Sequence, residues 1–447
     1  MRSSDVTHAA AALLTLTIAC GAQHHDARWV GGQLVQRTGH ALRDPAVRES
    51  EIPDGVSLED GLSQDEAGAL ALWRNAAFLE TLAQLGFSRS ALMQAGLLSN
   101  PVFSVLFPLG PKQLEFALKL PVEAVWLRPK RVAAARLDDE QVAEQLVQSG
   151  LDVVRNAKVA WGTLRLARAR LAIAEESVDV AARIASLAEA RLAAGDASPL
   201  EVAAARGDAL VAEDDTLRLR QEALIAEEQL RSLLGLRASD VPLRLEDSLG
   251  PAPAPLEASP LLEAAFAARP DLRAAELTVE AARERAGLSR WEALSLAGIA
   301  DAKHERSQGL LVGPGLEVGI PIFDWNQAGM ARADAEVVRA VRHEAALRDG
   351  VALEVKEAAA RYARARKAAE LLDTRIVPEL ERFVRGAEEA FAAGETSRLE
   401  PLAARVQLLR ARVRQAEGAA DVSSSQAELE RSVGCRLQPP AETAASR

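Results

Sequence analysis

His24, His25 and Asp26 form a cluster of side chains that could bind a metal ion. A protein zinc site needs further ligands at a regular spacing, and none follows this cluster, so we interpret it as incidental. His304 and His343 are likewise isolated. The sequence contains no nucleophile elbow, no phosphate-binding loop and no metal-binding signature. We therefore predict that the protein is not an enzyme and holds no metal ion or cofactor.

Two glutamates recur at matching places in the sequence. Glu201 follows Gly195 by six residues, and Glu400 follows Gly394 by the same number. In both places the glycine interrupts a long helical pattern and a serine restarts it, which is helix C-cap chemistry followed by N-cap chemistry. Each place is therefore predicted to be the tip of a helical hairpin. A carboxylate in the first turn after the tip is favoured by the helix dipole.

The two predicted tips belong to an internal repeat. The tip glycines are 394 − 195 = 199 residues apart, and the same offset relates Leu230 to Leu429 and Gly235 to Gly434. A constant offset without a gap indicates one unit written twice, each in the order helix, β-hairpin, long helix, tip and return helix. We expect the first repeat over residues 59-240 and the second over 259-436, with a proline-rich linker at 241-258.

Long helices must position these tips. Aromatic residues make up only 4% of the chain, whereas Ala, Leu, Glu and Arg are abundant, which favours helices packed through small residues. Pro129 and Pro378 are expected to interrupt the helical pattern. Between them, residues 131–194 contain no proline and would span about 95 Å as a helix. A seven-residue spacing of apolar residues predicts an antiparallel coiled coil closed at Gly195. The spaced residues are Leu164, Leu171, Val178, Ala185 and Leu192 before the tip, and Leu210, Leu217 and Leu224 after it.

Short strands precede the long helix in each repeat. Val102–Phe107 is rich in β-branched and aromatic residues, and Gln113–Leu120 alternates between apolar and polar residues. This pair predicts a β-hairpin with one apolar and one charged face. In the second repeat Leu294–Lys303 is a weaker strand candidate, and Leu316–Pro321 repeats the alternation. A soluble sheet and the strands of an outer-membrane barrel would both show this pattern, so the alternation leaves the two open.

The N-terminus has the layout of a secretory signal. Arg2 is followed by a short apolar run to Ala19, so residues 1-19 are predicted to be a signal peptide. Ala19 before Cys20 is similar to a bacterial lipobox, although Thr17 stands where leucine is preferred. We expect lipidation of Cys20, with ordinary cleavage nearby as the alternative. Residues 20-58 are expected to be an irregular lipidated segment, and residues 437-447 a disordered tail.

The charge and the hydropathy exclude some functions. The net charge of −11, with basic residues interleaved with acids, argues against a nucleic-acid partner. No apolar run reaches the roughly 18 residues of a membrane-spanning helix. Two strand pairs cannot close a barrel alone, so membrane strands would need several chains. Trp126 and Trp325 follow the strand-ending prolines, where a membrane-interface belt and packing below the sheet both explain them.

An ordered set of motifs resembles the TolC family of outer-membrane efflux proteins, nearer its CusC- and CzcC-like lipoprotein branch. The resemblance covers essentially the whole chain after the signal peptide, in order and with both repeats. Its motifs are Gln94–Pro101 before the first strand, Arg269–Leu272 at the start of the second repeat, Gly319–Asp324 after the last strand, the two Gly-x-x-Ser tips, and Leu230–Gly235.

The resemblance implies a mainly α fold with a small β part. Long antiparallel coiled-coil hairpins would form a TolC-like α-helical barrel in the periplasm. Four strands per chain of a homotrimer would contribute to a 12-stranded β-barrel in outer-membrane lipid, and the chain would be lipid-anchored.

In function, the resemblance implies an outer-membrane channel that serves as the exit duct of a tripartite efflux system. Transport through it would be passive, and it would be coupled to a periplasmic adaptor (membrane fusion protein) and an inner-membrane pump of RND or related type. Heavy-metal or drug export is the implied cargo class. The alternatives are a type I secretion exit duct, or a non-pore periplasmic coiled-coil scaffold lipoprotein, which would not need the strand pairs.

The resemblance also implies roles for the tip residues. An acidic residue after the second tip commonly lines the closed pore, which suggests Glu400 and, by the repeat, Glu201 as a constriction. A ring of such carboxylates could repel anions and bind cations. A second acidic position of the family is Ala403 here, which weakens that ring. The residues expected to contact the adaptor are Gly195, Asp196 and Ser198 at the first tip and Gly394, Glu395 and Ser397 at the second.

Overall fold

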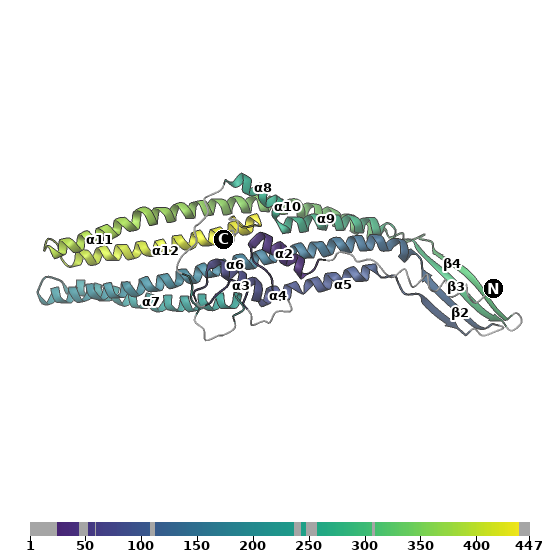
Figure 1. The fold of residues 1–447 in the computed structure, drawn as a ribbon, viewed down its shortest axis with the longest axis horizontal. Coiled ribbons are helices and arrows are strands. Elements are labelled where there is room, and N and C mark those ends of the chain that lie inside the picture. The colour runs from purple at the N-terminus through teal and green to yellow at the C-terminus, as the bar shows by residue number, and fades with distance from the viewer. Residues whose placement is uncertain are drawn as a thin grey trace, which may run out of the picture.

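The computed structural model of the chain is an elongated molecule, with helices along most of its length and a β-sheet at one end (Figure 1). It describes residues 25–43, 52–58, 60–107, 112–236, 243–246, 257–305 and 309–437. The expectations for the signal peptide, for Cys20 and His24, and for most of the linker and tail fall outside these residues. Two helical hairpins point away from the sheet, and their tips lie together at the far end of the molecule (Figure 1).

In the described part of the chain, four helices precede the first strand. Helix α2 spans Ala27–Thr38, and Asp26 caps it by accepting a hydrogen bond from the Trp29 N–H. The expectation of an irregular segment to residue 58 is therefore wrong here, because this cap and the burial of Val30 and Leu34 stabilise a helix. Helix α3 begins with a capping box, in which Ser63 and Glu66 each bond to the other's backbone at the three-residue spacing visible in the sequence. Helices α3, α4 and α5 span Gln64–Arg74, Ala76–Leu82 and Gln84–Gly96.

The first hairpin consists of α6 (Glu123–Ala193) and α7 (Pro199–Leu233). Helix α6 has 71 residues, which corresponds to a length of about 105 Å. The predicted interruption at Pro129 is wrong, because the helix continues through this residue. Pro129 lies in the second turn, where the missing N–H removes one hydrogen bond and packing of the following turns maintains the helix.

The second hairpin is divided as its proline predicts. Helices α8 (Ala258–Ala268) and α9 (Pro270–Ser289) lead to the second strand pair, and α10 (Gln327–Leu371) follows it. A π-helical turn, η2 (Leu372–Ile376), separates α10 from α11 (Val377–Ala392). Pro378 comes directly after this turn, whose wider winding accommodates a residue without an N–H. Helix α12 (Leu399–Val433) returns along α10 and α11.

The four strands form one antiparallel sheet in the order β1-β2-β3-β4. Strands β1 (Val102–Leu106) and β2 (Lys112–Pro121) come from the first repeat, and β3 (Ser295–Glu305) and β4 (Gly309–Gly319) from the second. All four predicted strands are therefore present. The last one spans Gly309–Gly319 and not the predicted Leu316–Pro321, so it begins earlier than its alternating pattern and ends before Pro321. The central pairing joins the repeats, with Leu118 opposite Ala300.

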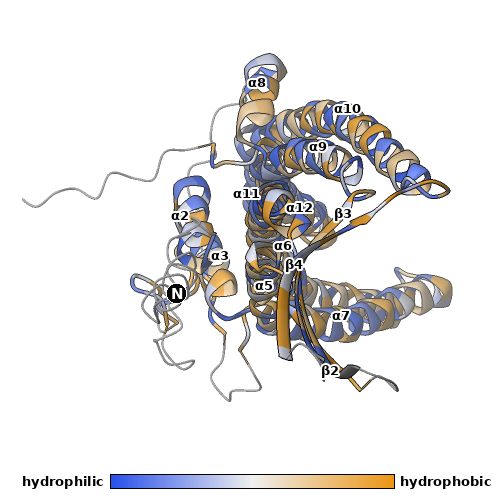
Figure 2. Ribbon diagram, turned by 90° about the vertical axis from the view of Figure 1, so that its right-hand side faces the viewer, coloured by the Kyte–Doolittle hydropathy of each residue, from blue (hydrophilic) through white to orange (hydrophobic). Residues whose placement is uncertain are grey.

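Viewed along the long axis, the helices form an arc and not a closed bundle (Figure 2). The neighbours along the arc are α7, α6, α12 and α10, and each contacts the next. Helix α7 buries Val202, Ala223 and Leu230 against α6, whereas the predicted coiled-coil residues Leu210, Leu217 and Leu224 are 65%, 63% and 56% exposed. That part of the coiled-coil prediction is wrong because a two-helix hairpin buries one face of α7, and alanines on that face permit closer packing. Within the described residues, no helix is long and apolar enough to cross a membrane.

Candidate functional site

The first hairpin tip is closed by a full set of capping hydrogen bonds. Gly195 has φ = 82°, and its N–H and that of Asp196 donate to carbonyls in the last turn of α6 at 3.0 and 2.8 Å. Glycine adopts this left-handed C-cap without steric cost. Ser198 Oγ accepts a hydrogen bond from the Glu201 N–H at 3.2 Å, and the Glu201 carboxylate accepts one from the Ser198 N–H at 3.0 Å. Glu201 therefore completes a capping box.

The second tip has the same glycine turn but no side-chain cap. Gly394 has φ = 77°, and α12 begins after Arg398, which makes no capping hydrogen bond. The prediction that Ser397 caps this helix is wrong, because the Glu400 N–H donates to the Ser397 carbonyl at 3.1 Å. The first tip has Pro199 at the first helical position, where its fixed φ suits the helix, and the second has arginine at the matching place.

Glu400 consequently has different surroundings from Glu201. It is exposed and lies at an open hollow between α11 and the second tip. In the part of the chain that the structure describes, no hydrogen bond or ion pair holds its carboxylate. The structure thus brings Glu400 together with Glu395 and Ser397 at one tip and leaves Glu201 in the other hairpin. The hollow is lined by Phe383, Gly386, Ala387, Glu395, Thr396, Ser397 and Glu400.

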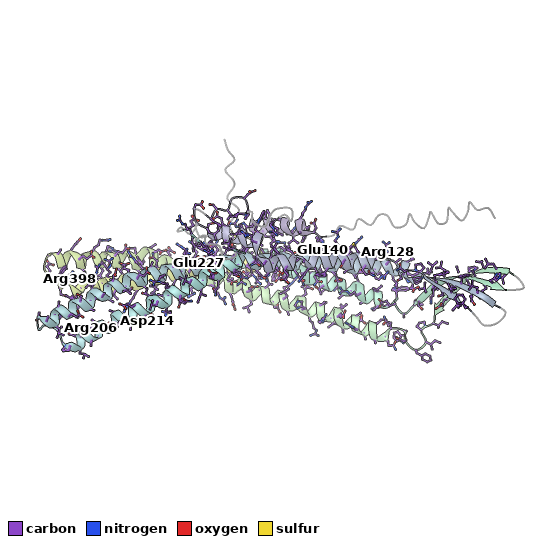
Figure 3. The ribbon with its side chains drawn as sticks, turned by 90° about the horizontal axis from the view of Figure 1, so that it is seen from below. Arg128, Glu140, Arg206, Asp214, Glu227 and Arg398 are labelled. Atoms are coloured by element: carbon purple, nitrogen blue, oxygen red, sulfur yellow. The ribbon has the colours of Figure 1, made fainter. Side chains whose placement is uncertain are left out.

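Ion pairs link the two hairpins along their length. Arg405 of α12 lies 2.7 Å from Glu176 of α6, and Arg170 of α6 lies 2.5 Å from Glu417 of α12. All four side chains are 31–44% exposed, so each pair contributes about 1 kcal/mol or less. Other pairs stay within one hairpin, such as Arg206 with Glu189 at 2.6 Å, near the end of the molecule where Arg398 also lies (Figure 3).

At the base of the hairpins the ion pairs are buried. Lys158 of α6 is 8% exposed at its side chain and lies 3.3 Å from Asp65 and 3.0 Å from Glu430. Burial opposes ionisation of Asp65, but the hydrogen bond to His40 and the charges of Lys158 and Arg436 outweigh it. They hold the pKa of Asp65 well below its usual range, so this carboxylate is ionised. The cluster ties α3, α6, α12 and the chain after α2 together.

Arg269 forms a second buried centre at the base. Its side chain is 2% exposed and donates to Asp271 at 2.6 Å and to Glu354 at 2.6 Å, and also to the carbonyl of Ser432 at 3.0 Å. Burial alone would lower the pKa of Arg269, and the two carboxylates raise it. The motif Arg269–Leu272 thus has a structural role. The sequence did not predict the wider cluster, because its members come from separate segments that only the fold brings together.

The sheet separates its charged residues from its apolar residues. Paired residues share a face, so the register places the Phe116 and Leu118 row on one face and the Glu115 and Lys119 row on the other. The first face includes Leu310, Val312 and Leu316, which are 62%, 71% and 66% exposed, and carries one polar side chain among those described, His304. Every described carboxylate and ammonium group of the strands lies on the second face, where Lys119 pairs with Glu317 at 2.6 Å and Lys303 with Asp301 at 2.6 Å.

Exposed aromatic residues gather where the sheet meets the helices. Trp126 is in the first turn of α6, Trp291 precedes β3, and Trp325 follows β4. They are 38%, 50% and 53% exposed, and Phe323 beside Trp325 is 91% exposed. On this chain, therefore, Trp126 and Trp325 are not buried by packing below the sheet.

The two described members of the histidine cluster, His25 and Asp26, make structural contacts. Asp26 is occupied as the cap of α2, and His25 packs edge-on against Trp29 with ring centres 4.5 Å apart. The backbone N–H of His25 donates to the Asp139 carboxylate at 3.0 Å, which fastens this end of α2 to α6. Among the described residues, no three potential metal ligands come together.

Comparisons of the sequence and of the structure with known proteins agree with each other. The sequence model of the family described as outer membrane efflux protein matches residues 116–236 and 261–435. The cobalt-zinc-cadmium resistance protein CzcC of Cupriavidus metallidurans is 27% identical over 391 residues, which cover 84% of this chain and 89% of CzcC. The solved outer-membrane channel OprN has a TM-score of 0.69 and 18% identity, covering 89% of this chain and 98% of that one. CusC has a TM-score of 0.65 and 19% identity, covering 88% and 98%.

The two channel structures show a shared fold, and the family match covers more than half of the chain. The predicted resemblance is thereby confirmed, as is the prediction of a transport protein and not an enzyme. The chain belongs to the outer membrane efflux protein family, the TolC-like family that its motifs predict.

Proposed function

We propose that three copies of this outer membrane efflux protein form the exit duct of a tripartite efflux system. The observation that carries the proposal is the sheet, which has one apolar exposed face, one charged face and two unpaired edges. An apolar face turned to lipid and a charged face turned to water are what a membrane barrel requires. A soluble sheet would bury its apolar face under helices, and here it is exposed.

The dimensions of the strands fit a bilayer. Strands β3 and β4 have 11 residues each. At about 3.3 Å per residue and a tilt of about 45°, they rise about 25 Å, which is the height of the apolar band of an outer-membrane barrel. Trp126, Trp291 and Trp325 would then lie at the membrane surface, where aromatic residues form a belt.

The unpaired edges support a ring of copies. An open strand edge cannot lie in lipid, so β1 of one copy must pair with β4 of another. Three copies of four strands give the 12-stranded barrel. The arc of helices would continue in the same way, and the exposed α7 residues Leu210, Leu217 and Leu224 would pack against a neighbouring copy.

The tips would form the inner mouth of the duct. Periplasmic adaptor contact is proposed at both turns, through Gly195, Asp196 and Ser198 and through Gly394, Glu395 and Ser397. For the pore constriction the surroundings favour Glu400, because its carboxylate is exposed and unpaired, whereas that of Glu201 is engaged in a cap. We propose that three Glu400 carboxylates form a ring around the pore axis. The ring is weaker than one with two acidic positions per chain, because the second position is Ala403.

The cargo and the anchor are separate parts of the proposal. The relative CzcC is named for cobalt, zinc and cadmium resistance, which supports heavy-metal export, and drug export is the alternative. An inner-membrane pump of RND or related type is part of the same proposal. A deletion strain should become sensitive to these metals; unchanged metal tolerance with new drug sensitivity would favour drug export.

The lipid anchor at Cys20 has its own test. If Cys20 is lipidated, the protein should incorporate labelled palmitate, and Cys20→Ser should abolish the incorporation.

The decisive experiment measures assembly and conductance together. The purified protein should have a trimeric mass in detergent and should form ion-conducting channels in planar bilayers. A monomeric or dimeric protein without channel activity would favour a periplasmic scaffold. A matched pair of variants tests the sheet: Val312→Arg on the apolar face should cost about 2–4 kcal/mol near the middle of the bilayer, and Leu311→Arg on the charged face should be tolerated.

A further inference from the structure

Glu144 and Gln148 are buried acceptors on one face of α6, where α2 and α9 pack against it. Each residue is 8% exposed. Glu144 Oε2 and Gln148 Oε1 are both buried, and neither accepts a hydrogen bond from a described residue. Side chains four residues apart are neighbours on a helix surface. Buried acceptors that receive no hydrogen bond lower the stability of the folded protein. A hydrogen-bond donor is therefore required between these two neighbouring side chains.

The orientation of Gln148 is determined by its other neighbour. Its Nε2 donates to Asp152 at 3.4 Å, and Asp152 also accepts a hydrogen bond from Arg431 Nε at 2.7 Å. An ionised carboxylate only accepts hydrogen bonds, so the NH₂ group of Gln148 must face Asp152. The amide oxygen therefore faces away from Asp152, on the side of Glu144. Turning the amide over would give Glu144 a donor but would place the amide oxygen against the Asp152 carboxylate, so two acceptors would again face each other without a hydrogen.

We propose that Glu144 is protonated and donates a hydrogen bond from its carboxyl group to Gln148 Oε1. This bond completes a chain of contacts from Glu144 through Gln148 and Asp152 to Arg431, which also pairs with Glu354 of α10. The proton thus fastens the region under α2 to the buried ion pairs that hold α12 and α10. Loss of the proton leaves a buried negative charge and two unpaired acceptors.

The electrostatic surroundings favour a proton over a metal ion. Burial is the largest influence and raises the pKa of Glu144, and Glu140 of α6 raises it further. Arg37 of α2 and Arg273 of α9 lower it, and the net effect is a raised pKa. The same two arginines would repel a metal cation. Arg37 offers the rival arrangement, because its buried Nε has no hydrogen-bond partner and could face an ionised Glu144 through a water molecule.

The sign of the pH dependence follows from the raised pKa. The folded protein holds this proton more tightly than the unfolded chain does. Below the pKa of the unfolded state, Glu144 is protonated in both states, and above the pKa of the folded state it is ionised in both. Between the two values only the folded state keeps the proton, and the stability that this proton contributes is lost at the upper value. The stability contributed by this site therefore falls as pH rises between the two pKa values. Mild acid should therefore stabilise the folded protein at this site.

The test compares Glu144→Gln with the wild-type full-length protein in detergent. An amide can donate to Gln148 Oε1 at any pH, so the variant should unfold on the order of 2 °C above wild type near pH 7.5, and the difference should disappear near pH 5. Glu213→Gln, at an exposed carboxylate of α7, is the control and should show no such convergence. A wild-type infrared band of a protonated carboxylic acid, absent from Glu144→Gln, is the direct readout.

The opposite results would overturn the proposal. If Glu144→Gln is less stable than wild type near neutral pH, Glu144 is ionised and held by Arg37. If the wild-type protein shows no protonated carboxyl band that depends on Glu144, the proton is absent. In wild-type protein labelled in its glutamates, the absence of any protonated glutamate band would also overturn the proposal, even if the variant folds poorly.

Discussion

The two hairpins come from the same repeat and differ in how firmly their helices are held. The first has an uninterrupted α6 and a tip closed by the capping box of Ser198 and Glu201. The second is divided by a π-helical turn before Pro378 and lacks a side-chain cap at its tip. Asp179 stands at the matching place of Pro378 in the first repeat, and Pro199 stands where the second has arginine.

Two substitutions between otherwise similar repeats thus make one hairpin stiffer than the other. A proline at the first helical position pre-organises the first tip, and a proline within the second hairpin prevents a continuous α-helix. Both hairpins nevertheless end in buried ion pairs at their bases. We expect the difference to lie in the arms and tips, not in their attachment.

The largest effects should therefore be similar in the two hairpins. Lys158→Met at the base of the first and Arg269→Met at the base of the second each remove a buried cation that two carboxylates share. Each should lower the free energy of unfolding by about 3 kcal/mol. Chemical denaturation measures this, with Arg405→Met at an exposed pair as the control, expected to cost about 1 kcal/mol or less. A large loss for only one base variant would contradict equal attachment.

The tip glycines should also respond alike. Gly195→Ala and Gly394→Ala place a side chain at positive φ, and nothing lies within 4 Å of either added Cβ. The cost is therefore that of the backbone alone, about 1–2 kcal/mol at each tip. Thermal unfolding of the two variants checks this. Clearly unequal losses would show that a neighbour, and not the backbone, sets the cost.

The capping serines should separate the tips. Ser198→Ala removes a capping hydrogen bond and should cost about 1 kcal/mol, whereas Ser397→Ala should change the stability by only a few tenths. Amide hydrogen exchange in the first turns of α7 and α12 locates the effect. Equal losses would mean that Ser397 caps α12 after all.

The smallest expected change is local. Pro378→Ala restores an N–H and should let the turn at residues 372–376 become α-helical, which slows amide exchange there with little change in global stability. Pro129→Ala, in a helix without such a turn, is the control and should leave residues 372–376 unchanged. Unaltered exchange in Pro378→Ala would mean that packing, such as Leu372 against Gly418, maintains the π-helical turn.

Much of the fold was predictable because its signals are local. The Gly–Ser tips, the capping box at Ser63 and the alternation in β2 each depend on residues within a few positions of one another. The structure contains all of these features, except that the serine of the second tip does not cap its helix. The missed helix α2 depends on burial of Val30 and Leu34 against α6, which no local pattern reveals. The division into residues 59-240 and 259-436 stays a prediction.

The site was predictable in position but not in detail. Motif spacing located both tips, but the different surroundings of Glu201 and Glu400 came from the structure, because one tip has a cap and the other a hollow. The same is true of the sheet: alternation in sequence left membrane and soluble strands open. Only the register of four strands from both repeats placed the apolar side chains on one face.

By itself the sequence determined the repeat, the helix periods, the tips and the family, because capping chemistry and periodicity act between neighbours along the chain. The tertiary structure decided which side chains meet across the chain. It assembled the buried ions around Asp65 and Arg269, left the α7 leucines exposed, and buried Glu144 and Gln148 of α6 where α2 and α9 pack against that helix. Such contacts depend on how helices distant in sequence pack, and no pattern within one segment contains that information.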